Sequence, residues 1–386
     1  PAQEQRRRLS TAASRTRSPS GRSSSACPPK SLLRCRAVYR AWRSATSARD
    51  FLLAHHARQP ALPLACGQHH DILAFDHRAA ANAQLHRVAR LDRHLYVDAS
   101  CDGLLVLSTY YKGMHGSHIS ICNPTTRELA SVVGPPWDFS TLGIYPHRPT
   151  SEYRLLLHQG SRKDLPKDQI GCFILPLGPD QSPRYIGWPE TKAELLDEPV
   201  HVHDGLHWYP DPGYHRSGSR KRESKPIIVF DTIAESFRQM HSPIVPTQAY
   251  IFEKDGMLGI YCHDDDKNTV GIWVLQNYES EVWDLKYQIR LPVEEIRGRV
   301  EDYVDYDFRD INLWDVNDVS GDGGMLLLVN FGWSVFHIDT DGKLIDSFNF
   351  DLQRLCVYQC QLKQSLVQHT FFPALKGYVV NASLFI

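Results

Sequence analysis

Short apolar runs separated by turn residues recur from about residue 64 to residue 386, and they constrain the fold of this chain more than any other feature. The runs are four to six residues long, which is the length of β-strands. No helical pattern of about twelve residues interrupts them, so alternating β and α units are not expected. The region therefore predicts an all-β body. The runs lie at 104–107, 119–122, 153–157, 172–175, 226–230, 258–261, 272–275 and 325–329.

Two turn units repeat along the same region, and their spacing predicts a fold. At about 40–50 residues per four-stranded blade, the repeat is typical of a β-propeller with roughly six or seven blades over residues 64–386. A pair of β-sandwiches is the alternative. The first unit is an Asp-Gly pair, which supplies the positive φ of a tight turn before a strand, at 102–103, 204–205, 255–256 and 322–323. The second unit is a strand that ends in a polar hairpin, at 122–128, 230–236, 275–280 and 338–342.

Charge is distributed unevenly along the chain. Residues 1–59 contain thirteen Lys or Arg and two acidic residues, whereas the rest contains 30 basic and 42 acidic residues, so that the net charge is −1. Residues 1–28 are rich in Arg, Ser and Ala and almost lack large apolar residues, so we expect a disordered basic tail. No aromatic residue separates the arginines at 14–20 for base stacking, so nucleic acid is not expected as a partner.

The sequence also favours one class of cellular compartment. No run of about 18 apolar residues is present, so neither a transmembrane helix nor a membrane partner is expected. The N-terminal residues lack the apolar centre of a signal peptide. The nine cysteines include no Cys-x-x-Cys pair, which is typical of reduced thiols. We therefore expect the protein in the cytoplasm, the nucleus or both.

Residues 29–60 have a different pattern, with apolar residues at helical spacing and arginines between them. The pattern predicts a helix from Ser31, as its N-cap, to Arg43, because two prolines precede it. A second short helix is predicted from Ala48 to His56, ending before the next proline. Two such helices are too small to form a core of their own, so we interpret them as part of a helical module.

No catalytic, cofactor or metal site is expected. His201 and His203 have the spacing that places two imidazoles on one face of a strand, but no further ligand completes a metal site. The sequence HDDD at 263–266 lacks the ligand spacing and the glycine of a calcium loop. The usual phosphate-loop, hydrolase and zinc-protease motifs are absent as well. A carbohydrate-active enzyme is disfavoured because no carboxylate pair stands out. The chain is therefore expected not to be an enzyme.

Several motifs together resemble a plant, grass-type F-box protein. Residues 29–43, PKSLLRCRAVYRAWR, and residues 51–56, FLLAHH, are similar to the C-terminal half of an F-box. Later segments resemble the F-box-associated region of these proteins. They lie at 101–105, 122–127, 145–147, 152–154, 259–261 and 272–275.

This resemblance implies the subunit of an SCF-type E3 ubiquitin ligase that selects the substrate. It implies an F-box that docks on a Skp-type adaptor, which bridges to a cullin, and a C-terminal β domain that binds an unidentified target protein. No cofactor is implied. The residues expected to bind the adaptor are Leu32, Leu33, Cys35, Val38 and Trp42.

The sequence departs from the F-box pattern on its N-terminal side. An F-box normally opens with Leu-Pro, further Leu and Ile residues and a first helix, but residues 1–27 are rich in Arg and Ser instead. We therefore expect the first helix of the F-box to be missing and adaptor binding to be weakened. An adaptor-deficient module that binds target proteins without ubiquitin-ligase coupling is the alternative function.

Overall fold

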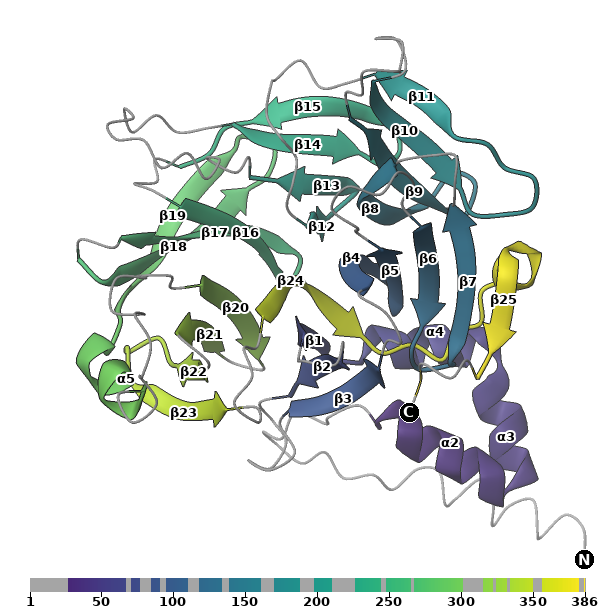
Figure 1. Ribbon diagram of the computed structural model, residues 1–386, viewed down its shortest axis with the longest axis horizontal. Helices are drawn as coiled ribbons and strands as arrows, with labels where there is room; N and C mark the ends of the chain where they lie inside the picture. The colour runs from purple at the N-terminus through teal and green to yellow at the C-terminus, as the bar shows by residue number, and fades with distance from the viewer. Residues whose placement is uncertain are drawn as a thin grey trace, which may run out of the picture.

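Six small antiparallel sheets are arranged in a ring in the computed structural model of this protein (Figure 1). The ring is a six-bladed β-propeller, which confirms the predicted fold. The blade number is the lower of the two expected, and the paired-sandwich alternative is wrong. The structure describes residues 27–66, 71–76, 85–90, 95–109, 118–133, 139–160, 170–187, 198–209, 226–243, 248–264, 267–300, 315–321, 324–331, 334–349, 356–381 and 385. The tail predicted at 1–28 lies outside these residues except for its last two.

Each blade has four strands in the order of the chain, apart from additions made by the C-terminal segment. Blade 1 has β24 (Cys356–Lys363), β1 (Ala61–Cys66), β2 (Asp71–Phe75) and β3 (Leu85–Arg90). Blade 2 has β4 (Leu95–Cys101), β5 (Leu104–Thr109), β6 (His118–Asn123), β7 (Glu128–Val133) and β25 (Lys376–Val380). Blade 3 has β8 (Phe139–His147), β9 (Glu152–Gln159), β10 (Gly171–Pro176) and β11 (Arg184–Gly187).

The other half of the ring continues in the same way, and two short helices accompany it. Blade 4 has β12 (Val200–Val202), β13 (Gly205–Trp208), β14 (Ile227–Asp231) and β15 (Ser236–Met240). Blade 5 has β16 (Gln248–Lys254), β17 (Met257–Asp264), β18 (Thr269–Asn277) and β19 (Val282–Arg290). Blade 6 has β20 (Asp315–Gly321), β21 (Gly324–Phe331), β22 (Ser334–Ile338) and β23 (Leu344–Asn349). The helix α5 (Val293–Val300) follows blade 5, and the short 3-10 helix η6 (Phe372–Ala374) precedes β25.

The two ends of the β region close the ring by pairing with each other. The C-terminal strand β24 runs antiparallel to β1, with Ala61 opposite Lys363 and Leu62 opposite Leu362. The closing pair begins at Ala61, three residues before the predicted start of the β domain at residue 64. The same sheet therefore contains both ends of the ring, and blade 1 is complete only with β24.

An apolar cluster lies between each pair of neighbouring blades in the described part of the ring. In β5, Leu104 and Val106 belong to the cluster shared with blade 3, whereas Leu105 and Leu107 belong to the cluster shared with blade 1. Both faces of the strand are therefore buried. This explains why the strands appear in the sequence as continuous apolar runs rather than as an alternation of apolar and polar residues.

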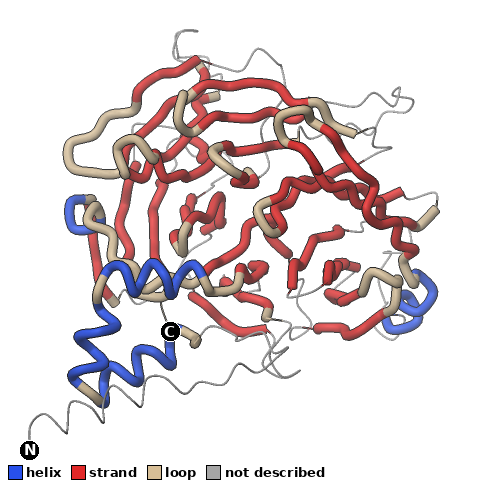
Figure 2. The backbone as a smooth tube through the Cα atoms, turned by 180° about the vertical axis from the view of Figure 1, so that it is seen from behind, coloured by secondary structure: helices blue, strands red, loops and turns tan. Residues whose placement is uncertain are grey.

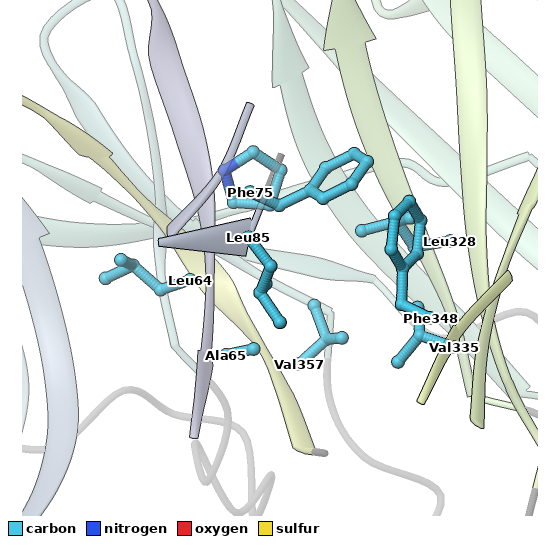
Figure 3. A pocket seen from close by; sticks show the side chains of 9 residues that line it. Leu64, Ala65, Phe75, Leu85, Leu328, Val335, Phe348 and Val357 are labelled. Atoms are coloured by element: carbon cyan, nitrogen blue, oxygen red, sulfur yellow. The ribbon is translucent and has the colours of Figure 1, made fainter. Parts of the chain in front are cut away.

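The seam between blades 1 and 6 contains a small pocket lined by apolar residues (Figure 3). Phe75 of blade 1 and Phe348 of blade 6 meet edge to face there, with ring centroids 5.0 Å apart. Leu328 and Val335 of blade 6 and Val357 of blade 1 also line the pocket. Since no polar side chain lines the pocket, it lacks the directional groups with which binding sites orient a ligand.

The repeated turns have local causes that the sequence shows. Asp102 and Gly103 have φ values of 51° and 85°, and Asp255 and Gly256 have 51° and 79°, as a tight hairpin turn requires. The unit at 204–205 differs from the prediction, because the positive φ of 53° falls on His203 instead. The polar hairpins are held by an Asn or Asp side chain that accepts bonds from following backbone N–H groups, at Asn123, Asp231, Asn277 and Asp339.

Three short helices precede the propeller and lie at the edge of the ring beside blades 1 and 2 (Figures 1 and 2). They are α2 (Pro29–Val38), α3 (Arg40–Ser47) and α4 (Arg49–Ala57). The prediction of one helix from Ser31 to Arg43 is wrong, because Tyr39 is extended and separates α2 from α3. The N-cap is Pro28 rather than Ser31. None of the described helices is long and apolar enough to cross a membrane.

Candidate functional site

The helices α2 and α3 expose an unusual number of large apolar side chains. Val38 is 87% exposed, Tyr39 61%, Trp42 54% and Leu33 43%, and Cys35 is exposed as well. Four of the five residues predicted to bind an adaptor, namely Leu33, Cys35, Val38 and Trp42, therefore lie at the surface. Exposed large apolar side chains on a small helical unit make this unit a candidate for a protein interaction.

Leu32 differs from the other predicted residues, because only 3% of it is exposed. Its side chain packs with Leu52 of α4 and with Leu366 and Val367, which follow β24. In this structure Leu32 holds the helices to the propeller and is not accessible to a partner. The helical spacing of the sequence could not separate the two roles, because the segment that covers Leu32 is more than 300 residues away along the chain.

The arrangement of α2 and α3 is fixed by an arginine that the sequence analysis did not single out. Arg36 Nε donates to Thr46 Oγ1 at 2.9 Å, and a terminal nitrogen of Arg36 donates to the carbonyl oxygen of Thr46. Thr46 is buried, and its hydroxyl donates to the carbonyl oxygen of Trp42 at 2.6 Å. Burial lowers the pKa of Arg36. These bonds position the turn of α3 that presents Trp42.

The helices join the propeller through α4. His56 Nδ1 lies 3.2 Å from the carbonyl oxygen of Gln364, and its Nε2 lies 3.5 Å from Asp102 Oδ1. Asp102 lies in the tight turn between β4 and β5, and its other oxygen accepts a bond of 2.8 Å from the hydroxyl of Tyr153. Burial by itself would raise the pKa of Asp102, but the bonds from His56 and Tyr153 and the nearby positive charge outweigh it and lower the pKa to about 2.

The histidines that suggested metal-ligand spacing do not converge. The charge of His201 acts on Asp102, whereas the His203 ring packs edge to face on Tyr278. His207 is fully buried, and its Nε2 lies 2.7 Å from the Tyr278 hydroxyl. Among the described residues, no three His, Cys, Asp or Glu side chains are grouped as metal ligands. The absence of zinc stays a prediction, and elemental analysis of the purified protein is its measurement.

The cysteines and the acidic cluster at 263–266 are described only in part. Eight cysteines are in thiol form in the structure, and the ninth, Cys356, lies in β24. Burial raises the pKa of Cys122 to about 12, so this thiol remains protonated. Residues 265–266 lie outside the described residues.

A half-buried carboxyl group in blade 2 gives the propeller a pH dependence that can be measured. Ser108 Oγ donates to Asp98 Oδ1 at 2.8 Å, and burial raises the pKa of Asp98 to about 6. Because the folded-state pKa lies above the unfolded value, Asp98 contributes stability at low pH that is lost as the pH rises through 6. We expect Asp98→Asn to raise the free energy of unfolding by about 1–2 kcal/mol at pH 8, and the gain to shrink as the pH is lowered to 4.

Urea unfolding of both proteins at the two pH values checks this expectation. The matched control is Asp255→Asn, which changes an exposed Asp in the turn of blade 5 and should have the same small effect at both pH values. If Asp98→Asn raised the free energy of unfolding equally at pH 4 and pH 8, the raised pKa of Asp98 would not be the cause of the gain.

Known proteins resemble this chain in two ways, through the fold of solved structures and through a family of propeller domains. Among curated proteins, no relative of the chain was found by sequence. A nidogen–laminin complex has a chain that is similar over 80% of this chain and 99% of its own, with 9% identity and a TM-score of 0.46. Apo AztD from Citrobacter koseri is similar over 77% of this chain and 89% of its own, with 10% identity and a TM-score of 0.37. A protein of unknown function from Bacteroides caccae covers 78% and 99%, with 13% identity and a TM-score of 0.39.

The family comparison is more specific than the structural one. The family described as F-box associated beta propeller domain matches residues 68–311, which are more than half of the chain. The match runs from the β1–β2 connection into the segment that follows blade 5, and it contains most of the repeated turns and strands. The chain therefore belongs to the family of F-box associated β-propeller domains.

Proposed function

We propose that this protein is the substrate-recognition subunit of an SCF-type E3 ubiquitin ligase of the grass-type plant class. In this proposal the propeller binds a protein target, and the helices α2 to α4 bind a Skp-type adaptor that recruits a cullin. The subunit itself is not an enzyme and needs no cofactor. Membership in the F-box associated propeller family supports the assignment, because such domains accompany F-box proteins.

The exposed apolar face of α2 and α3 is the observation that carries the proposal. Val38 at the end of α2, Tyr39 between the helices and Trp42 in α3 are each more than half exposed. Exposed aromatic residues of this type are frequent hot spots in protein interfaces. They lie in the segment, 29–43, that resembles the C-terminal half of an F-box.

The charge around this face favours an acidic partner surface. The only acidic residue in α2, α3 and α4 is Asp50. Opposite charges across an interface steer association and set its specificity. The exposed basic residues of the unit are Lys30, Arg34, Arg40, Arg43, Arg49 and Arg58.

Adaptor binding is expected to be weak in the chain as it stands. Directly upstream of Pro29 the sequence has Arg and Ser instead of the Leu-Pro opening and first helix of an F-box. This composition favours the second candidate, a module that binds its targets without coupling them to ubiquitin transfer. Nucleic acid and membrane are not proposed as partners, and the proposed location is the cytoplasm, the nucleus or both.

The experiment is an affinity capture with purified components. The chain, an adaptor and a cullin are mixed, and the complex is analysed by size-exclusion chromatography at increasing concentrations. A ternary complex that forms only at high concentration supports the ligase subunit. No complex at any concentration, together with retained binding of a cross-linked target protein, would support the uncoupled module instead.

A further inference from the structure

Few contacts between described residues hold the helices α2 to α4 to the propeller, so each contact has a large share in fixing the direction of the helices. A single small cluster of four residues provides the apolar part of the joint: Leu32, Leu52, Leu366 and Val367. The helices lie at the edge of the ring rather than over its face (Figures 1 and 2). Polar contacts from His56 of α4 add the directional part.

Asp102 is the point at which three separate parts of the protein meet. It lies in the turn of blade 2, receives the Tyr153 hydroxyl from blade 3 at 2.8 Å, and faces His56 Nε2 of α4 at 3.5 Å. The turn itself cannot easily move, because Asp102 and Gly103 have positive φ values and Gly103 packs against the backbone that follows β24. The propeller therefore holds the Asp102 carboxylate in a fixed position that faces α4.

The two ring nitrogens of His56 both face oxygen acceptors. The carbonyl of Gln364 only accepts, so Nδ1 carries the proton of that bond, and Nε2 is directed at the Asp102 carboxylate. The imidazolium is the form that donates from both nitrogens. The contact between His56 and Asp102 is thus strongest when the ring is charged.

We propose that Asp102 is a positioning residue that, through His56, fixes the direction of α2 to α4 on the propeller. The proposal rests on the proposed function, because this direction decides how an adaptor on Val38 and Trp42 would face a target on the propeller. The Asp102 side chain is 42% exposed, so solvent moderates the strength of the contact.

Other titratable groups also lie around Asp102, but among the described residues the structure shows a direct polar contact with α4 only from His56. Burial lowers the pKa of His369 to about 4, and burial also lowers the pKa of His201. Arg49 of α4 is always positive, and Cys101 and Tyr153 stay protonated because burial raises the pKa of each.

The test compares Asp102→Asn with Asp255→Asn in the full chain by hydrogen exchange. Asn tolerates positive φ as Asp does, so both variants keep their turns, and only the first turn faces a helix. Asp102→Asn should raise the exchange rate of α4 amides about fivefold at pH 5.5, which corresponds to a loss within the usual range of such pairs. Asp255→Asn should leave the exchange of the α4 amides unchanged. Intact mass confirms that the new Asn-Gly sequences have not deamidated.

A second variant tests the contact between His56 and Asp102 without changing the turn that contains Asp102. His56→Gln should raise α4 exchange by a similar factor, and the double variant should add no more than either single one. Equal α4 exchange in the native chain and Asp102→Asn, or an equal effect of Asp255→Asn, would overturn the proposal. Because exchange is measured without an adaptor, failure of adaptor binding would count against the proposed function alone.

Discussion

Replacement of Gly103 with alanine is expected to lower the free energy of unfolding by about 3 kcal/mol or more. Gly103 has a φ of 85°, which disfavours any side chain. An added Cβ would lie 2.9 Å from the carbonyl oxygen of Lys363 and 3.0 Å from the amide nitrogen of Ser365, both too close. These atoms belong to the backbone at the end of the closing strand β24, so they cannot rotate away. Urea unfolding at neutral pH measures the loss.

The matched control for this substitution is Gly256→Ala in the corresponding turn of blade 5. Gly256 has a φ of 79°, but no atom lies within 4 Å of the position that its Cβ would take. Only the cost of the left-handed backbone remains, about 1 kcal/mol. If both substitutions cost the same, the close approach between the turn of blade 2 and the closing strand does not limit stability.

Replacement of residues 1–28 with a normal F-box opening is expected to raise affinity for a Skp-type adaptor by about a hundredfold or more, as further buried interface area would allow. A standard interface buries about 800 Å² on each partner. The present helices have 10, 8 and 9 residues, and Leu32 is already turned toward the propeller, so they supply only part of such a surface. Calorimetric titration of both chains with purified adaptor measures the difference.

Trp42→Ala in the completed chain should weaken adaptor binding by about 2 kcal/mol or more, roughly thirtyfold, as is usual for a central aromatic residue. Leu285→Ala is the control, because Leu285 is 47% exposed but lies on β19 of blade 5. It should leave the affinity unchanged. Tight binding by the native chain, equal to that of the completed chain, would show that the F-box half present here is sufficient. No binding by either chain would contradict the ligase assignment.

The strands, the repeated turns and the class of fold could be predicted from the amino-acid sequence. These features have local causes: Leu104 to Leu107 form a continuous apolar run because both faces of β5 are covered, and Asp102-Gly103 and Asp255-Gly256 adopt positive φ in hairpin turns. The exposed character of Val38 and Trp42 was also suggested by the resemblance of their segment to an F-box. Local patterns report on burial and on backbone conformation, and neither depends on which distant segment does the covering.

Only the tertiary structure decided the number of blades, the closing partner of β1 and the roles of Leu32 and Asp102. The pairing of β1 with β24 and the addition of β25 to blade 2 join segments that lie hundreds of residues apart. Leu32 and Trp42 look alike in the helical pattern, but Leu366 and Val367 cover the first and leave the second exposed. In the sequence Asp102 is recognisable only as a turn residue, because its contact with His56 arises from the folded structure. Contacts of this kind depend on register and closure of the whole ring, and no short stretch of sequence encodes them.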